Sequence, residues 1–444
     1  MVSKSNISEL SSAFRPNAPD DKTFQVVFRA NNYYTKKDYE SAIEEYSKAL
    51  SILQSNPETK KASDFSALVF SNRSASFFQR KKWKDAVKDA EQVIRIRPEW
   101  AKGYFRKAEA LMQLEKYEEA LDCYRVAQQK NPRNTQIPLQ IEKALILKDN
   151  KSMGLTIFSL VPGRDICISK NSITNKIQSK IFDFAVKMKN LIYIIVDNET
   201  KECIVVDACW DVDGIIKFVK DRHLKLVGAI VTHHHFDHVG GKPPPPFNQL
   251  PIKVSGLCDL LKRFPKLKAY IHPLDIPYIL KSNPELSDLF TPIPLSKLPI
   301  KNRQSHFCNT NIISLIINFT LNSSSALSNT NASRIIPTPH NFTLSLGNFT
   351  HLKFLHTPGH TEGSQSILVN ETRLFTGDTL MCGCIGRLDL PGGNLKQMKK
   401  TLRKRLGELD DKIVVYPGHD YGGDWTTIGI EKKKGVIGKI KRKS

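Results

Sequence analysis

The residue types most suited to chemistry are concentrated in one short segment, Thr232-His233-His234-His235-Phe236-Asp237-His238. Imidazole nitrogens and carboxylate oxygens are good ligands for zinc, iron and other borderline cations. The segment directly follows an apolar run at 226–231 and precedes two glycines, so it lies at a turn after a strand. A lone His is more often a satisfied core residue, but burying this many polar groups together is costly unless they coordinate something. The segment therefore predicts a metal site.

The apolar segments on either side of this turn predict a layered α/β fold. Runs rich in β-branched residues alternate with turns at 191–197, 203–208, 226–235, 352–360, 366–378 and 412–420. Two amphipathic segments, 212–223 and 394–409, have helical spacing and lie between some of these runs. A mixture of strands and helices of this kind favours sheets that are covered by helices.

The segment at 232–238 contains the His-x-His-x-Asp-His signature of the metallo-β-lactamase superfamily, which this part of the chain resembles. Three further motifs follow in the family's order. They are HTPGHTEGS with His360, FTGDTL with Asp378 and YPGHDYGG with His419. Asp207, at the end of the segment CIVVD, matches an Asp that orients the metal cluster in that family.

The resemblance implies a role for each of these residues. The first metal would be bound by His233, His235 and His360. The second would be bound by Asp237, His238 and His419, and Asp378 would bridge both metals. His234 lies between two ligands and is expected to point away, while His272 and His356 are expected to be structural.

Within the superfamily, the segments HTPGHT, TGDTL and PGHDY resemble the glyoxalase II-like branch. This implies a four-layer αββα sandwich over 155–431, with insertions near 243–300 and 301–340. It also implies hydrolysis of S-D-lactoylglutathione or a related acyl-thiol. Two metals about 3.5–4 Å apart can share a hydroxide formed at neutral pH, which would attack the thioester carbonyl. Zinc is the expected metal, with iron or a mixed pair also open, and Asp237 or Asp378 could accept a proton.

Arg387, in the segment GCIGRLDLPGG, matches the position of a basic residue that contacts glutathione in glyoxalase II. An Arg side chain is well suited to binding a carboxylate. A structural salt bridge is the alternative role for Arg387. Asp389 stands where the family has a Tyr, which weakens the match to a glutathione site.

Two other functions stay open at this point. The iron-dependent persulfide dioxygenases share the ligand signature and have a Gly-Arg-x-Asp segment like 386–389. They use one iron, held by residues that match His233, His360 and Asp378. A second alternative is a chaperone-docked scaffold with an inactive metal domain, and the intact set of ligands argues against it.

Residues 24–133 have helical periodicity and an internal repeat. The segments at 39–50, 83–94 and 117–128 are self-similar, and Ala86 and Ala120 are 34 residues apart, as are Pro98 and Pro132. A period of 34 residues is that of the tetratricopeptide repeat, which is a pair of antiparallel helices. The sequence therefore predicts three such repeats, followed by a capping helix or linker at 134–154. The fold class is an all-α repeat array followed by an α/β sandwich.

The repeats resemble those of chaperone cofactors, in which a five-residue clamp holds the carboxylate of an acidic chaperone C-terminus. Four clamp positions are matched, by Asn31, Asn72, Lys102 and Arg106. Lys102 and Arg106 are four residues apart on one helix and share a face, so they could grip carboxylates together. The fifth position is Val27 in place of Lys, and docking of another protein without this specificity is the alternative.

Composition limits the remaining classes. The chain has 444 residues, a formal net charge of +22 and eight Cys without paired spacing, which favours reduced thiols in the cytoplasm. Residues 1–23 form a polar, flexible N-terminus without a secretory signal, and 432–444 form a basic tail. The basic excess is diffuse and carries no aromatic-interleaved motif, so neither a nucleic acid nor a membrane is the expected partner.

Overall fold

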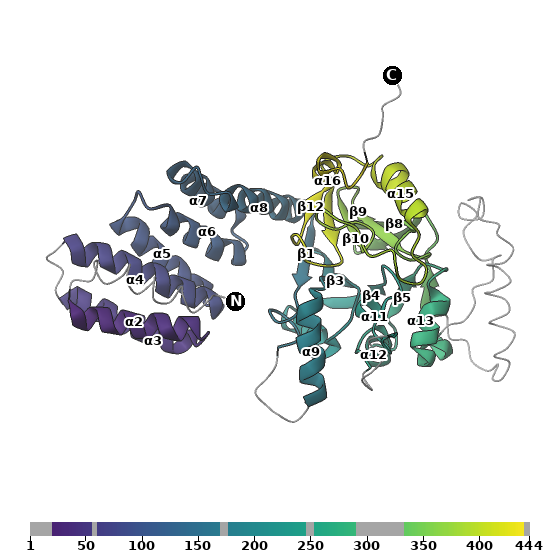
Figure 1. The fold of residues 1–444 in the computed structure, drawn as a ribbon, viewed down its shortest axis with the longest axis horizontal. Coiled ribbons are helices and arrows are strands. Elements are labelled where there is room, and N and C mark those ends of the chain that lie inside the picture. The colour runs from purple at the N-terminus through teal and green to yellow at the C-terminus, as the bar shows by residue number, and fades with distance from the viewer. Residues whose placement is uncertain (1–19, 56–59, 169–175, 246–252, 290–332, 439–444) are drawn as a thin grey trace, which may run out of the picture. The chain divides into compact units, whose positions relative to one another are not determined.

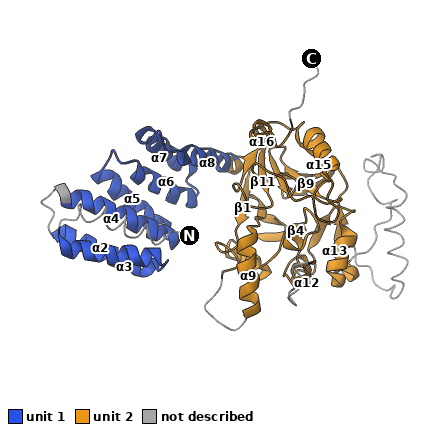
Figure 2. Cartoon of the chain, in the orientation of Figure 1, with its two compact units in different colours: residues 1–149 blue, residues 150–444 orange. Residues whose placement is uncertain are grey.

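The computed structural model describes residues 20–55, 60–168, 176–245, 253–289 and 333–438 (Figure 1). The chain forms two compact units, residues 1–149 and residues 150–444 (Figure 2). Most of the expected N-terminal segment, most of the insertion at 301–340 and the last part of the basic tail lie outside the described residues. Within the described ranges, no helix is both long and apolar enough to cross a membrane.

The first unit is built of helices whose small residues allow close packing. Ala42, Ala86 and Ala120 are fully buried, and Tyr46 and Tyr124 fill the space between helices with almost no exposed surface. From the helix at 21–35 to the helix at 117–130, each helix packs on its neighbours in the chain, as expected of a repeat array. The helices are α2 (Asp21–Thr35), α3 (Tyr39–Ser55), α4 (Lys60–Gln79), α5 (Trp83–Ile96), α6 (Ala101–Gln113), α7 (Tyr117–Lys130) and α8 (Gln136–Ser152).

The second unit contains two six-stranded sheets. In the first sheet the order is β1-β2-β3-β4-β5-β6, and the pairs from β3 to β6 are parallel. In the second the order is β12-β11-β10-β9-β8-β7, and only β10 and β11 pair in parallel. The strands of the first sheet are β1 (Leu155–Leu160), β2 (Ile192–Asp197), β3 (Glu202–Val206), β4 (Lys225–Ile230), β5 (Lys268–Ile271) and β6 (Ile335–Pro337). Those of the second are β7 (Phe342–Leu346), β8 (Thr350–His356), β9 (Gln365–Val369), β10 (Arg373–Gly377), β11 (Val414–Pro417) and β12 (Thr426–Thr427).

The two sheets face each other, and helices cover their outer faces. Tyr193 of β2 makes edge contacts with Phe375 of β10 and Tyr416 of β11, at 5.1 and 5.6 Å between ring centres. Figure 1 shows α9, α12 and α13 beside the first sheet, and α15 and α16 beside the second. This is the predicted αββα sandwich. The helices are α9 (Lys176–Met188), α10 (Val212–Asp221), α11 (Phe236–Val239), α12 (Leu257–Arg263), α13 (Ile276–Ser282), η3 (Pro284–Leu289), α15 (Leu395–Thr401), η6 (Leu402–Leu406) and α16 (Ile428–Lys434).

The range near 243–300, where we expect an insertion, contributes ordered elements to the first sheet. Helices α12 and α13 pack into its hydrophobic core through Leu260, Leu261 and Ile279, all of which are fully buried. Strand β5 pairs in parallel with β4 on one side and with β6 on the other.

A second group of histidines lies between the sheets, separate from the sequence signature. The rings of His272 and His356 stack with their centres 4.0 Å apart, and the main-chain N–H of His356 donates to Nδ1 of His340. The guanidinium of Arg405 contacts the His340 ring. Burial, together with the positive charge of Arg405, lowers the pKa of His340 to about 4 and that of His272 well below its ordinary value. These rings are therefore held neutral, which agrees with a structural role for His272 and His356.

This cluster predicts a loss of stability in acid. The unfolded chain protonates His near its ordinary pKa of 6.5, while the folded chain resists until lower pH. Stability is therefore full above about pH 6.5 and falls as the pH drops toward 4. For the half-buried His340, discounted for solvent screening, we expect about 1 kcal/mol, or roughly 2–4 °C in melting temperature.

The measurement is thermal unfolding of chelator-treated protein between pH 7 and 4.5. Across this pH range, the melting temperature of His340→Gln should fall by less than that of the parent protein. His351→Gln, at an exposed position on β8, is the control and should follow the parent. Identical pH profiles for the parent and His340→Gln would contradict the expectation.

Candidate metal centre

The signature segment lies at the end of β4, where a hydrogen-bonded carboxylate fixes the chain. Asp207 follows β3 and accepts the main-chain N–H and the hydroxyl of Thr232, both at 2.7 Å. Its Oδ2 also lies 2.9 Å from Nδ1 of His238. Asp207 is almost completely buried and has a φ of 57°, a conformation that Asp tolerates better than most residues. Asp207 therefore contacts both the start of the signature segment and the ring of His238.

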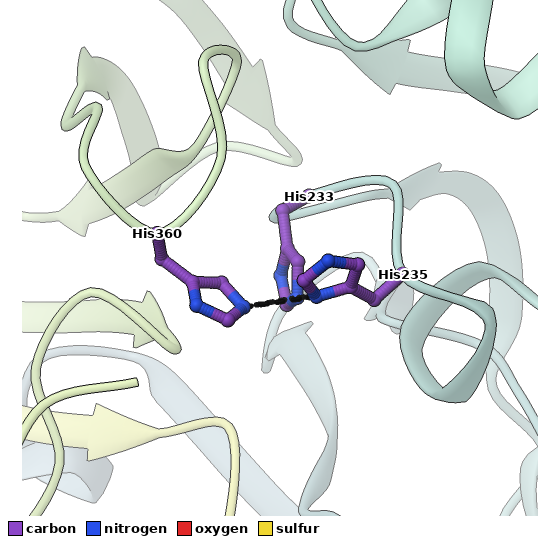
Figure 3. A group of neighbouring side chains, drawn as sticks. All are labelled: His233, His235 and His360. Atoms are coloured by element: carbon purple, nitrogen blue, oxygen red, sulfur yellow. Dashed lines mark hydrogen bonds between the residues drawn. The ribbon is translucent and has the colours of Figure 1, made fainter. Parts of the chain in front are cut away.

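Three histidines from two separate loops form the first group of candidate metal ligands (Figure 3). Nε2 of His360 lies 3.2 Å from Nε2 of His233 and 2.9 Å from Nδ1 of His235. His233 and His235 are themselves 3.0 Å apart at these atoms. The main-chain carbonyl of Arg387 lies 2.6 Å from Nδ1 of His360 and can accept its proton, which leaves the Nε2 lone pair directed at the other two rings.

A second group lies beside the first. Nε2 of His238 and Nε2 of His419 are 3.2 Å apart, and Oδ2 of Asp237 lies 3.6 and 3.4 Å from them. Nδ1 of His419 is 2.8 Å from the carbonyl of Met188 at the end of α9. These distances allow the three ligand atoms to contact one cation.

Asp378 connects the two groups. Its Oδ1 lies 3.5 Å from Nε2 of His238 and 3.4 Å from Nε2 of His419, while its Oδ2 lies 3.5 Å from Nε2 of His360. Oδ1 of Asp378 is buried and has no hydrogen-bond partner within the described ranges. An orphaned buried carboxylate oxygen is costly unless a cation compensates it. The donor set and this oxygen therefore fit a site for divalent metal.

The electrostatics of the site depend on the same groups. Burial by itself would raise the pKa of Asp378, but the imidazoles of His419 and His238 hold it well below its ordinary value. Burial would lower the pKa of His238, but Asp237, Asp378 and Asp207 raise it to about 10. The carboxylates thus hold positive charge at this point, as a proton or as a metal. Because imidazole must be neutral to bind a metal, protons and cations compete for the site.

Some residues that shape the centre could not be found from the sequence. Asn190, just before β2, donates from Nδ2 to the carbonyl and to Oδ2 of Asp237 at 3.0 and 3.2 Å. Trp210 donates from its indole N–H to Oδ1 of Asn190, which fixes the amide orientation. Tyr421 stacks on the ring of His419 at 4.8 Å and remains half exposed. A single Asn and a Tyr in a turn carry no spacing signal, so only the folded chain reveals these contacts.

The predicted glutathione residue, Arg387, is already paired. Its Nε and Nη2 donate to the two carboxylate oxygens of Asp389 at 3.0 and 2.6 Å, and both side chains are exposed. Its main-chain carbonyl faces His360, so the residue lies near the first metal position. The ring of His234 stacks on Tyr278 at 4.5 Å and its Nδ1 lies 3.2 Å from Oδ1 of Asp275, so it faces α13.

The four predicted clamp residues lie in the first unit. Oδ1 of Asn31 accepts from the Tyr46 hydroxyl at 2.5 Å and lies 3.3 Å from Nδ2 of Asn72. Burial and the neighbouring Arg106 charge lower the pKa of Lys102, so the two basic groups are close together. Val27, at the fifth position, is buried.

Arg29 does not replace the missing basic residue of the clamp. It is paired with Glu45 at 2.9 Å. The two asparagines are therefore in contact, and Arg106 is paired with Glu109 at 3.1 Å. The fifth position, Val27, holds no charge.

Comparisons with known proteins agree with this architecture. Residues 188–243 and 259–419 match the metallo-beta-lactamase superfamily, and 27–55 and 101–134 each match a tetratricopeptide repeat. The hydroxyacylglutathione hydrolase GloC of Haemophilus influenzae is 40% identical over 84 residues, 19% of this chain and 38% of that protein. A STIP1 homologue of Dictyostelium discoideum is 33% identical over 135 residues, 30% of this chain and 22% of that protein.

The aligned segments span well under half the length of either relative. Among solved structures, ETHE1 from Myxococcus xanthus has a TM-score of 0.37 and 22% identity, covering 57% of this chain and 82% of the other. The assignment of the domains rests on the family matches at 188–243 and 259–419 and at 27–55 and 101–134. The chain therefore carries a metallo-β-lactamase superfamily domain, preceded by a domain of tetratricopeptide repeats.

Proposed function

We propose that this chain is a metal-dependent hydrolase of thioesters, of the hydroxyacylglutathione hydrolase type. The observation that carries the proposal is the pair of ligand groups joined by Asp378, whose Oδ1 is orphaned without a cation. The identity with GloC over 84 residues supports the thioester as substrate class. S-D-lactoylglutathione is the first substrate to test.

The residues of the chain divide the work between them. Two divalent cations bound at these groups would supply a nucleophile from water at neutral pH and polarise the thioester carbonyl. Asp378 and Asp237 are carboxylates kept ionised by the surrounding imidazoles, so either can accept the proton that the attacking water loses. Asn190 holds Asp237 in orientation, and no Ser or Cys nucleophile is needed.

The rim of the site gives the substrate its other contacts. Arg387 is a candidate for a glutathione carboxylate, in exchange for its pairing with Asp389. Such an exposed ion pair contributes about 0–1 kcal/mol, so exchanging it costs little. The thiol portion of the substrate would therefore lie on the side of the site where Arg387 and the exposed Tyr421 are found.

A second candidate function uses a subset of the same ligands. His233, His360 and Asp378 could hold a single iron, because Nε2 of His360 lies within 3.5 Å of both of the other ligand atoms. That arrangement would suit an iron-dependent persulfide dioxygenase. In that case the second group of Asp237, His238 and His419 would stay unused, whereas the proposed hydrolase would use both groups.

The repeats give a separate proposal about partners. We propose that they dock an acidic C-terminal peptide of a chaperone at Asn31, Asn72, Lys102 and Arg106. The resemblance of these four positions to the clamp of chaperone cofactors supports a chaperone as the partner, and the STIP1 homologue is similar over 135 residues of the chain. Binding would tether the hydrolase to its partner without altering the metal centre.

The first prediction from the proposed function concerns metal binding. In Gly418→Ala the new Cβ would lie 2.5 Å from Oδ1 of Asp378 and 3.0 Å from the His238 ring, so Asp378 must turn away. We expect metal affinity to fall by roughly 10–100-fold, as is usual when ligand orientation is lost. Bound metal after dialysis against a chelator series measures this. Gly429→Ala, whose Cβ would lie nearest to Asp411, is the control. Equal metal retention by the parent and Gly418→Ala would count against the centre.

The second prediction concerns activity. Metal-loaded protein should hydrolyse S-D-lactoylglutathione and release one thiol per turnover, detected by a thiol reagent. Asp378→Asn removes the bridging charge and should reduce kcat by at least about 100-fold, in line with the loss of a main electrostatic group. Asp411→Asn, an exposed carboxylate paired with Lys432, is the matched control.

The activity assay also separates the alternatives. Absence of turnover in protein that demonstrably contains metal would reject the thioester hydrolase. Oxygen uptake with glutathione persulfide would then support the dioxygenase. If Asp378→Asn changed neither metal content nor any activity, the metal domain would be an inactive scaffold.

The third prediction concerns the repeats. A peptide ending in Glu-Glu-Val-Asp should bind the full chain, and Lys102→Ala or Arg106→Ala should weaken binding about tenfold or more. The reason is that a charge-assisted hydrogen bond contributes about 1.5–3 kcal/mol. Titration calorimetry with the free-acid and C-terminally amidated peptides measures it. Arg29→Ala is the control, because Arg29 is a basic residue that is paired with Glu45. If peptide affinity were unchanged in both Lys102→Ala and Arg106→Ala, the clamp would be rejected.

A further inference from the structure

Asp275 is a buried carboxylate that neither the signature nor the ligand set includes. It follows β5 and immediately precedes α13, with 1% of its surface exposed. Asp at such a position usually caps its own helix, but this side chain makes no capping hydrogen bond to α13. Its oxygens are directed instead at two loops that belong to the metal centre.

The contacts of Asp275 join the ligand loops of the two sheets. Oδ2 accepts the main-chain N–H of His234 at 2.9 Å and the hydroxyl of Thr361 at 3.1 Å. Oδ1 accepts the main-chain N–H of Gly363 at 2.9 Å. One carboxylate therefore bonds to two separate segments. The first is the residue between the ligands His233 and His235, and the second directly follows the ligand His360.

Two neighbouring residues, Gly363 and Tyr278, pack closely around Asp275 and His234. A Cβ on Gly363 would lie 2.4 Å from Oδ1 of Asp275, so only glycine allows the loop to approach the carboxylate. Tyr278, one turn along α13, stacks on the ring of His234 with planes 15° apart. The same short helix therefore holds His234 through both its main chain and its ring.

The geometry points to Asp275 as a positioning residue that fixes the distance between His360 and the pair His233–His235. Those two loops come from different sheets, and their ligand atoms must lie within about 3 Å of one another. Gln365 also joins the sheets, by bonds to the main chain of Thr232 and Val231, but it contacts neither the residue between the ligands nor the residues just after His360. Asp275 is the contact that joins the loops at the ligands themselves. This inference rests on the proposed metal binding but not on the substrate.

Asp275→Asn tests the role without changing the size of the side chain. The amide keeps one acceptor oxygen, but its NH2 group cannot accept a hydrogen bond from a main-chain N–H. One of the two loops therefore loses its hydrogen bond to residue 275. We expect cobalt affinity of the apo-protein to fall by roughly 10–100-fold at one of two sites, measured by absorption during titration with Co²⁺ against a competing chelator. The visible spectrum of the bound cobalt should also change with the ligand geometry.

Asp197→Asn is the matched control. Asp197 is a fully buried carboxylate at the far end of β2 that accepts main-chain N–H groups of Thr200 and Phe349 at 3.0 and 2.8 Å. Both substitutions should lower the melting temperature, but only Asp275→Asn should lower cobalt affinity. Cobalt affinity within twofold of the parent in folded Asp275→Asn would overturn the inference.

The remaining outcomes are also decisive. If Asp275→Asn does not fold, Thr361→Val removes one of the three bonds at nearly constant volume and should give a smaller loss of affinity in the same titration. Unchanged affinity in that variant would overturn the inference. A parent protein that binds no cobalt would overturn the metal centre and this inference together, which separates that failure from a failure of Asp275 alone.

Discussion

The structure of the second unit depends on the cost of gathering five imidazoles and two carboxylates in one buried place. Without a cation these groups repel or are left unpaired, as the orphaned Oδ1 of Asp378 shows. The fold must therefore hold the ligands apart from water and close to one another before a metal binds. It does so with main-chain carbonyls of Met188 and Arg387 and with the carboxylates of Asp207 and Asp275, each of which fixes a ligand or a loop between ligands.

This constraint explains what could be predicted from the sequence. His233, His235, Asp237 and His238 are local, because they share one turn after a strand and their spacing is visible in the chain. Some buried strands are also visible in the sequence, since β2, β9 and β10 are buried along their whole length and each contains consecutive apolar residues. The family resemblance supplied the distant ligands, His360, Asp378 and His419.

What could not be predicted depends on contacts between distant segments. Asn190 and Asp237 are 47 residues apart, and Asp275 and Gly363 are 88 apart, so no periodicity connects either pair. The pairing of Arg387 with Asp389 is local, but an Arg two residues before an Asp does not show whether the two side chains meet. In the repeats, the resemblance identified four clamp positions, yet only the folded helices show that Asn31 and Asn72 meet and that Arg29 is occupied by Glu45.

The buried centre and its rim place different demands on a substrate. The ligands are fixed by short bonds from both sheets, so a thioester substrate of the proposed hydrolase would have to present its carbonyl to metals held at these ligands. At the rim, Arg387 and Asp389 form an exposed pair that contributes about 0–1 kcal/mol, and a substrate carboxylate can displace Asp389 at little cost. An uncharged thiol portion would leave that pair in place and lose little binding. It follows that the reaction type is determined by the centre, while the choice of thiol is decided by weaker contacts that a few substitutions could change.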